Sequence, residues 1–232
     1  MQQRMTIIKG IYLLENMNNN ILVLAPHGDD EVLGCGGSIA KHVESGDQVT
    51  VAFIKAAYDE RSAVQLENTG SAQRVLGYDN MIVMNLDENT IHNKLEFIRE
   101  LEIIINTVKP DTIYSTFYGD LHQDHRALFE ALNTAARIWA NHLVKKILLC
   151  ETISSTDQGI IRNINPFVPN YYVTLNDHHI DKKMDALACY EREIKKECHP
   201  RSIEHVLNIA KSRGREIRSS YAEAFMLMRF ID

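Results

Sequence analysis

Paired cysteines are lacking in this sequence of 232 residues. The four cysteines, at positions 35, 150, 189 and 198, show neither the spacing of a zinc finger nor that of a disulfide framework. Long apolar runs are lacking too, so we expect neither a signal peptide in the leader, residues 1–20, nor an integral membrane segment. These absences favour a protein of the reducing cytoplasm.

An excess of positive charge is also missing. The 31 acidic residues outnumber the 25 basic ones and give a net charge of −6, whereas nucleic-acid-binding domains usually carry a basic stripe. We therefore expect no nucleic-acid partner. The sequence is 45% hydrophobic, contains no repeat or linker, and is long enough for one sizeable core. We predict a single domain over residues 1–232.

Apolar runs and helical patterns alternate through the first two-thirds of the sequence. The apolar runs predict strands at 21–25, 49–54, 81–85, 111–115 and 146–151. Helices are predicted between and after them, near 37–45, 62–76, 93–108 and 125–140. Leu95 and Trp139 belong to apolar stripes that we expect to face the core. Such alternation is typical of an α/β protein with a Rossmann-like, mostly parallel sheet, helices on both faces and the strand order 3-2-1-4-5.

The pattern changes after the fifth predicted strand. Residues 152–170, which include two prolines, predict a long irregular segment of the kind that can cover a site. Two helices and a last strand are predicted to follow, near 180–196, 202–213 and 225–228. His178 and His179 are adjacent and would point to different sides of a helix or strand. We therefore expect them to lie in a loop or cap a helix rather than bind one metal.

Two polar stretches stand out, one after the first predicted strand and one after the fourth. His27-Gly28-Asp29-Asp30-Glu31 and His122-Gln123-Asp124-His125 each combine imidazoles with carboxylates. Either stretch alone is more typical of a helix N-terminus. In the order 3-2-1-4-5 the first and fourth strands are neighbours where the order reverses, so both stretches reach one crevice. Together they match a catalytic zinc site with three N/O ligands and an open position for water.

The sequence resembles the LmbE/PIG-L-like family of zinc-dependent N-deacetylases, in its bacterial-type branch. The resemblance rests on two specific motifs, PHGDDEVLGCGG at 26–37 and GDLHQDHR at 119–126, and shorter stretches extend it to about residue 230. One departure is Gly28, where the family commonly has proline. The resemblance implies removal of an acetyl group from N-acetylglucosamine or a similar amino sugar or conjugate. It also implies Zn²⁺, or another divalent cation, as the cofactor.

The resemblance assigns roles to five residues of the two polar stretches. His27, Asp30 and His125 would be the metal ligands, since neutral imidazoles and a carboxylate suit zinc. Asp29, next to a ligand, would be the general base toward the metal-activated water. His122 would stabilise the oxyanion or donate a proton to the leaving amine.

Further polar residues have more than one interpretation. Asp124 is best interpreted as a catalytic partner that orients an imidazole, although it and His122 could simply cap a helix. Arg61 would bind substrate or be a solvated arginine. Glu31 is expected to support a helix N-terminus or a loop. The stretch His199-Pro200-Arg201 is expected either to line the mouth of the pocket or to begin a helix.

Two other functions are compatible with these residues. One is a divalent-metal phosphoesterase, which would be expected to carry more carboxylates or a second metal and a basic grip on phosphate. The other is a carbohydrate-binding relative without activity, which the presence of Asp29 and His122 disfavours. The expected partner is a small N-acetylated sugar or glycoconjugate, in a pocket shaped by residues 152–232. A homo-oligomer is compatible with the sequence.

Overall fold

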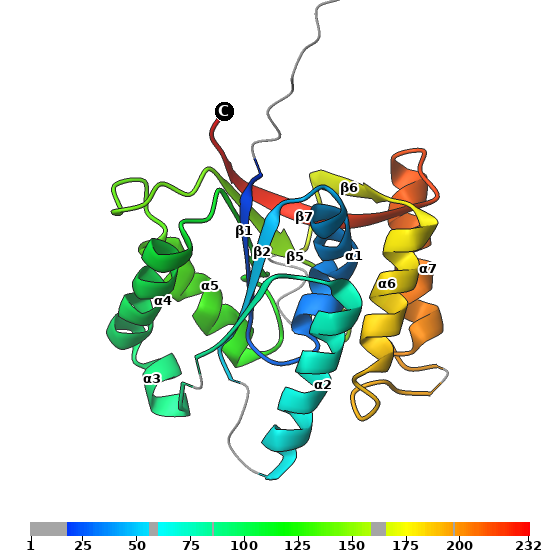
Figure 1. Cartoon of the computed structure of the whole chain (residues 1–232), viewed down its shortest axis with the longest axis horizontal. Helices are drawn as coiled ribbons and strands as arrows, with labels where there is room; N and C mark the ends of the chain where they lie inside the picture. The colour runs from blue at the N-terminus through cyan, green and yellow to red at the C-terminus, as the bar shows by residue number, and fades with distance from the viewer. Residues whose placement is uncertain (1–17, 56–59, 85, 159–165, 197) are drawn as a thin grey trace, which may run out of the picture.

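The computed structural model describes residues 18–55, 60–84, 86–158, 166–196 and 198–232. They form a seven-stranded sheet in the order β3-β2-β1-β4-β5-β7-β6 (Figure 1). The parallel strands are β1 (Asn20–Ala25), β2 (Gln48–Phe53), β3 (Asn80–Val83), β4 (Thr112–Thr116) and β5 (Lys146–Cys150). Two antiparallel strands extend the sheet beyond β5, namely β7 (Tyr221–Phe230) and then β6 (Tyr171–Leu175). The predicted α/β fold and the order 3-2-1-4-5 are confirmed.

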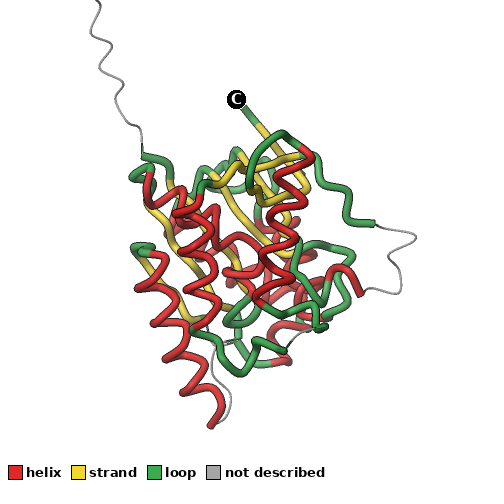
Figure 2. The backbone as a smooth tube through the Cα atoms, turned by 90° about the vertical axis from the view of Figure 1, so that its right-hand side faces the viewer, coloured by secondary structure: helices red, strands yellow, loops and turns green. Residues whose placement is uncertain are grey.

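Helices cover both faces of the sheet, as Figure 1 shows. One face carries α1 (Asp30–Glu44), α2 (Glu60–Leu76), α6 (Asp177–Ala188) and α7 (Ile203–Glu216). The other face carries α3 (Glu88–His92), α4 (Lys94–Val108) and α5 (Gln123–Ala135). Seen from the side of α6 and α7, helices lie in front of the strands (Figure 2). None of the helices in these residues is long and apolar enough to span a bilayer.

Because helices cover both faces of the sheet, the sequence of β1 is a continuous apolar run. Ile21, Val23 and Ala25 belong to the hydrophobic cluster under α1 and α2, whereas Leu22 and Leu24 belong to the cluster under α4 and α5. Successive side chains of a strand point to opposite faces, so a strand buried on both faces needs apolar residues throughout. The core therefore holds β1 rigidly, and β1 leads directly into the first polar stretch.

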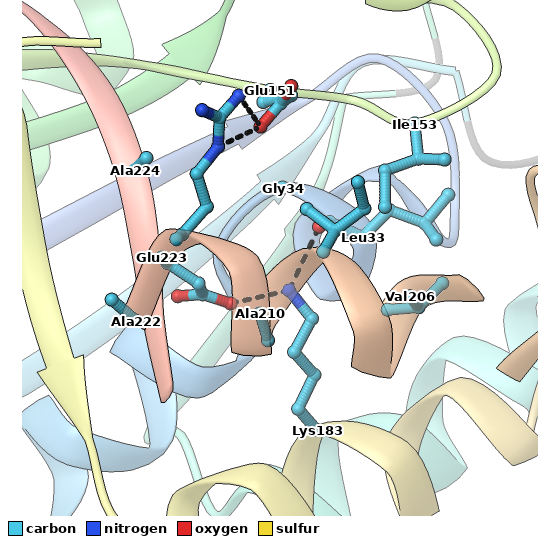
Figure 3. A pocket seen from close by; sticks show the side chains of 12 residues that line it. Leu33, Gly34, Glu151, Ile153, Lys183, Val206, Ala210, Ala222, Glu223 and Ala224 are labelled. Atoms are coloured by element: carbon cyan, nitrogen blue, oxygen red, sulfur yellow. Dashed lines mark hydrogen bonds and ion pairs between the residues drawn. The ribbon is translucent and has the colours of Figure 1, made fainter. Parts of the chain in front are cut away.

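A buried ion pair fills a break in α1. Cys35 interrupts the helix with φ of −150°. Glu223 of β7 accepts a hydrogen bond from the backbone N–H of Ser38 at 2.7 Å, and Lys183 of α6 donates to the carbonyl of Leu33 at 3.0 Å. Lys183 and Glu223 also pair with each other, as Figure 3 shows. Backbone groups left without helical partners at the break are thus satisfied, and α1 begins at Asp30 rather than at the predicted residue 37.

Two residues predicted to face the core are exposed. The helix α5 ends at Ala135 instead of residue 140, and Trp139, beyond its end, is 92% exposed. Leu95 lies in the first turn of α4 and is 59% exposed. The helical spacing of apolar residues continues past the helix end at Trp139, so periodicity alone misplaces this residue.

The C-terminal part differs most from the prediction. The strand β6 was not predicted, and α6 spans Asp177–Ala188 rather than 180–196. Asn176 fixes the start of α6, because its side chain accepts a hydrogen bond from the N–H of His179 in a capping box. β6 is a five-residue edge strand whose residues are mostly half-buried. In the predicted irregular segment 152–170, residues 156–158 form a 3₁₀ turn and residues 159–165 lie outside the described ones.

Candidate active site

The two polar stretches meet at one edge of the sheet. β1 and β4 are hydrogen-bonded neighbours, with Ile21 opposite Thr112 and Val23 opposite Tyr114. The connection after β1 leads to α1 on one face, and the connection after β4 leads to α5 on the other. The carboxyl ends of both strands therefore open on the crevice where ligands of open α/β sheets bind.

Three imidazoles converge in this crevice. His27 follows β1, while His122 and His125 belong to the start of α5. Each ring offers a nitrogen, and these three nitrogens all lie within 4.8 Å of one another. His125 is buried, His27 is half-buried and His122 is exposed. Within the described residues this is the group of histidine, cysteine and acidic side chains whose spacing suits a metal ion.

The Asp30 carboxylate lies between two of the imidazoles. Its Oδ2 atom is 3.2 Å from Nδ1 of His27 and 3.2 Å from Nε2 of His125. Asp30 is the first residue of α1, and its Oδ2 also accepts a hydrogen bond from the backbone N–H of His27 at 3.0 Å. Burial opposes ionisation of this carboxyl, but the two imidazoles outweigh it and hold its pKa well below the usual range.

The imidazoles of His27 and His125 each contact a second carboxylate through their other ring nitrogen. Oδ2 of Asp124 lies 3.0 Å from Nε2 of His27 and accepts a hydrogen bond from Nζ of Lys55 at 3.2 Å. Oδ2 of Asp120 lies 3.2 Å from Nδ1 of His125. Such carboxylates fix the orientation and tautomer of an imidazole. The sequence prediction missed Asp120, although it stands in the second motif, two residues before His122.

Asp120 is itself held firmly. It is fully buried, its Oδ2 accepts a hydrogen bond from Oγ1 of Thr156 at 2.9 Å, and its Oδ1 accepts one from the N–H of His122 at 2.8 Å. The Ser155 hydroxyl also donates to it. Ser155 and Thr156, at the 3₁₀ turn after β5, therefore fix the position of Asp120 beside the second polar stretch.

The balance of charge in the crevice favours a bound cation. Burial disfavours the charged form of His27 and His125, yet the neighbouring carboxylates outweigh it. They raise the pKa of His27 to about 9 and that of His125 to about 10. The carboxylates of Asp30, Asp120 and Asp124 thus favour positive charge in the crevice. A divalent cation with nitrogen and oxygen ligands fits this set of donors.

Asp29 lies beside this group and has an unusual backbone. It precedes α1 with φ of 105° and ψ of −30°, a left-handed conformation that is uncommon for a residue with a side chain. Asp29 is 3% exposed, and its Oδ2 accepts a hydrogen bond from Nη1 of Arg201 at 2.8 Å. Burial and the charge of Asp30 raise the pKa of the Asp29 carboxyl well above its usual value, while Arg201 opposes the rise.

The remaining candidates are placed as follows. His122 is the N-cap of α5, and its Nδ1 accepts a hydrogen bond from the N–H of Asp124 at 3.3 Å. His179 stabilises the start of α6 and pairs with Glu44 at 2.7 Å. Arg61 lies in α2, but its side chain is outside the described residues. Arg201 reaches the crevice and contacts Asp29. The sequence left open whether the stretch 199–201 lines the pocket or begins a helix.

Gly28 is required by a close approach of α2. A Cβ atom at this position would lie 2.8 Å from Oγ1 of Thr69 and 3.2 Å from Cγ of Gln65. Nε2 of Gln65 also donates a hydrogen bond to the carbonyl of Gly28 at 3.2 Å. Glycine therefore lets α2 pack directly on the turn that carries the polar stretch, and a side chain here would require the side chains of Thr69 and Gln65 to move.

Comparison with known proteins agrees with this geometry. Residues 22–136, which include both polar stretches, match the family model described as PIG-L, GlcNAc-PI de-N-acetylase. These residues form a PIG-L family domain. A relative from Escherichia coli K12, described as the uncharacterized deacetylase YaiS, is 26% identical over 180 residues, which are 74% of this chain and 90% of YaiS.

Solved structures share the fold of the whole chain, its PIG-L domain included. A conserved protein from Thermus thermophilus superimposes with a TM-score of 0.75 and 21% identity, covering 92% of this chain and 96% of that one. The N,N′-diacetylchitobiose deacetylase from Pyrococcus horikoshii gives a TM-score of 0.66 and 21% identity, covering 90% and 83%. At these identities the likeness concerns the fold, and the chemistry has to be argued from the residues of this chain.

Proposed function

We propose that this protein is a metal-dependent N-deacetylase acting on an N-acetylated amino sugar or a conjugate of one. The match of residues 22–136 to the PIG-L family model supports the reaction class. The observation that carries the proposal is the position of the Asp30 carboxylate, with one oxygen 3.2 Å from imidazole nitrogens of both His27 and His125. Asp29, a further carboxylate, stands next to this group.

His27, Asp30 and His125 would hold the metal ion, which we propose is Zn²⁺ or another divalent cation. This donor set of two imidazoles and one carboxylate leaves a position open for water. A zinc ion bound there would lower the pKa of a coordinated water to about 7. Asp124 and Asp120 would keep the two imidazoles oriented, because their carboxylates face the outer ring nitrogens.

Asp29 would take a proton from the attacking water. Its raised pKa suits a group that accepts a proton and then passes it on. Addition of the water oxygen to the acetyl carbonyl gives a tetrahedral adduct, and the C–N bond then breaks as a proton reaches the leaving nitrogen. His122, whose ring centre lies 4.7 Å from that of His27, would stabilise the oxyanion or donate this proton. The products are acetate and a free amine.

The substrate class rests on the family and on the deacetylases that share the fold. We propose a small N-acetylated sugar or glycoconjugate as the partner. Arg61 remains the candidate for binding a hydroxyl or carboxylate of that substrate. The same metal ligands could serve a phosphoesterase, so the test has to separate amide hydrolysis from phosphate release.

The test is an acetate-release assay with the zinc-loaded protein. N-acetylglucosamine and N,N′-diacetylchitobiose are the first substrates, and p-nitrophenyl phosphate is the competing one. We expect acetate and free amine in equal amounts from at least one sugar, and no phosphate. Phosphate release without acetate would favour the phosphoesterase. Sugar binding without any turnover would favour a carbohydrate-binding protein.

A further inference from the structure

The backbone and the side chain of Asp29 are each fixed by hydrogen bonds, and both sets of hydrogen bonds involve residues of one segment. Residues 189–202 connect α6 to α7. This connection supplies Tyr190, which acts on the backbone of Asp29 through Glu31, and Arg201, which contacts the Asp29 side chain directly. The metal-ligand motifs contain neither Tyr190 nor Arg201, and both lie at least 159 residues away from Glu31 or Asp29 in the sequence.

The first contact fixes the backbone. Oε2 of Glu31 accepts a hydrogen bond from the N–H of Asp29 at 3.0 Å, and the Tyr190 hydroxyl donates to Oε1 of the same carboxylate. Glu31 and Tyr190 are each 1% exposed, so both groups are out of water. A carboxylate that accepts hydrogen bonds at both oxygens has little freedom to rotate. It therefore stabilises the left-handed conformation of Asp29, which would otherwise cost energy.

The second contact fixes the side chain. Nη1 of Arg201 donates to Oδ2 of Asp29 at 2.8 Å, and Nε donates to Oγ of Ser154 at 2.6 Å. Nη1 also lies 3.3 Å from Oε2 of Glu193, in the same connection. A guanidinium is planar, so the hydrogen bond from Nε to Ser154 also fixes the direction in which Nη1 points. Arg201 thus sets the direction of the carboxylate that is proposed to receive the proton.

We propose that the connection between α6 and α7 positions the general base, with Tyr190 acting through Glu31 on the Asp29 backbone and Arg201 acting on its side chain. This inference rests on the proposed function, because it takes Asp29 as the base. Tyr190, Glu31 and Arg201 are then positioning residues, and they act on the proton transfer rather than on metal binding.

A neighbouring tyrosine provides a matched control. Tyr78 belongs to the same buried hydrophobic cluster as Tyr190 and is also almost fully buried. Its hydroxyl has no hydrogen-bond partner among the described residues. Tyr78→Phe and Tyr190→Phe therefore make the same chemical change in the same surroundings, and only the second removes a donor to Glu31. A general loss of packing would affect both variants alike.

The experiment measures kcat, KM, zinc content and the midpoint of thermal unfolding for both variants, using the sugar that releases acetate. For Tyr190→Phe we expect kcat to fall about 10- to 100-fold, the effect of losing a group that orients a reacting residue. KM and zinc content should stay at the wild-type values. Tyr78→Phe should keep the wild-type kcat. Equal kcat values in the two variants would overturn the proposal.

Tyr190→Phe in the Asp29→Ala background separates the positioning role of Tyr190 from the role of Asp29 as general base. If Tyr190 acts only through Asp29, Tyr190→Phe should have no further effect on the residual turnover of Asp29→Ala. A further 10-fold or larger drop, on the order of the single-variant effect, would overturn the positioning role. Full turnover by Asp29→Ala alone would instead overturn the general-base role that the proposed function assigns to Asp29. Inactive Asp29→Ala together with a fully active Tyr190→Phe would overturn this inference alone.

Arg201→Lys tests the second contact. Lysine keeps the positive charge but not the planar fork that joins Asp29 to Ser154. We expect kcat to fall while zinc content is unchanged, and the Arg201→Lys, Tyr190→Phe double variant should lose less than the product of the two single losses, since both act on one side chain. Multiplying losses would mean that the residues act independently of Asp29, which would overturn the proposal.

Discussion

Histidine–aspartate contacts occur at both ends of the sheet, and their surroundings differ. At the amino end, Nδ1 of His42 lies 2.6 Å from Oδ2 of Asp47, and Nε2 lies 2.9 Å from the hydroxyl of Tyr114. At the carboxyl end, each of His27 and His125 lies between two carboxylates. The first arrangement satisfies one imidazole, whereas the second gathers several charged groups around one space.

The pKa values express this difference. Burial lowers the pKa of His42, because one aspartate does not compensate for the loss of water. At the other end, paired carboxylates raise the pKa of His27 to about 9 despite comparable burial. A histidine–aspartate contact is therefore not by itself evidence of a metal or catalytic site. Convergence of several such contacts from separate loops is the informative feature.

The largest expected effect is loss of the metal. His125→Ala removes an imidazole that lies between Asp30 and Asp120, and we expect the purified variant to lose its zinc and all measurable acetate release. Elemental analysis checks the metal content. His42→Ala, the matched change at the amino end, should keep a full zinc complement. A full complement in both variants would contradict the assigned ligands.

Removing the proposed base should stop turnover without releasing the metal. Asp29→Ala is expected to lower kcat by about 10²- to 10⁴-fold, the usual contribution of a general base. Zinc content should remain that of the wild type, because Asp29 is not a proposed ligand. Asp47→Ala serves as the control, since this aspartate also has a side-chain partner, His42, but lies at the amino end of the sheet. Acetate release at the wild-type rate by Asp29→Ala would remove the general-base role.

A smaller effect is expected behind the metal site. Asp120→Asn keeps the size of the side chain but removes the negative charge that faces Nδ1 of His125. We expect zinc affinity or turnover to fall about 10- to 100-fold, as is typical for partners of metal-bound imidazoles. A competition titration with a zinc chelator measures the affinity. If both affinity and turnover match the wild type, Asp120 does not orient His125.

The smallest effect concerns stability at acid pH. The folded protein keeps His42 neutral because its pKa is lowered from 6.5, so below about pH 6.5 the unfolded chain binds more protons at this residue. The free energy of unfolding should therefore decrease as the pH falls from 6.5 through the folded pKa. Urea unfolding at pH 7.5 and pH 5 measures the decrease, which should be smaller in His42→Gln. An equal decrease in the variant would contradict this contribution.

The parallel half of the fold could be predicted from the sequence because its signals are local and strong. Apolar runs such as 21–25 are buried on both faces, and their alternation with helices predicts the strand order. The antiparallel strands were harder to predict. β6 is an edge strand without a continuous apolar run, and the start of α1 depends on Glu223 and Lys183, which lie far away in the sequence.

The site could be predicted to a similar extent. The two motifs predict which residues gather, and the neighbouring positions of β1 and β4 explain why they meet. The contacts of Asp29 with Arg201 and, through Glu31, with Tyr190 could not be predicted, since no spacing relates residues so distant. A buried carboxylate such as Asp120 was missed because sequence does not distinguish it from a solvated one.

The position of β7 has a consequence for how this protein is synthesised. β7, residues 221–230, lies between β5 and β6, although β6 precedes it in the chain. During translation β6 therefore has no strand to pair with until residues near 221 have left the ribosome. The ion pair that completes α1 also waits for Glu223. The nascent protein can form its histidine cluster early, but the surroundings of that cluster are completed only after most of the chain has emerged.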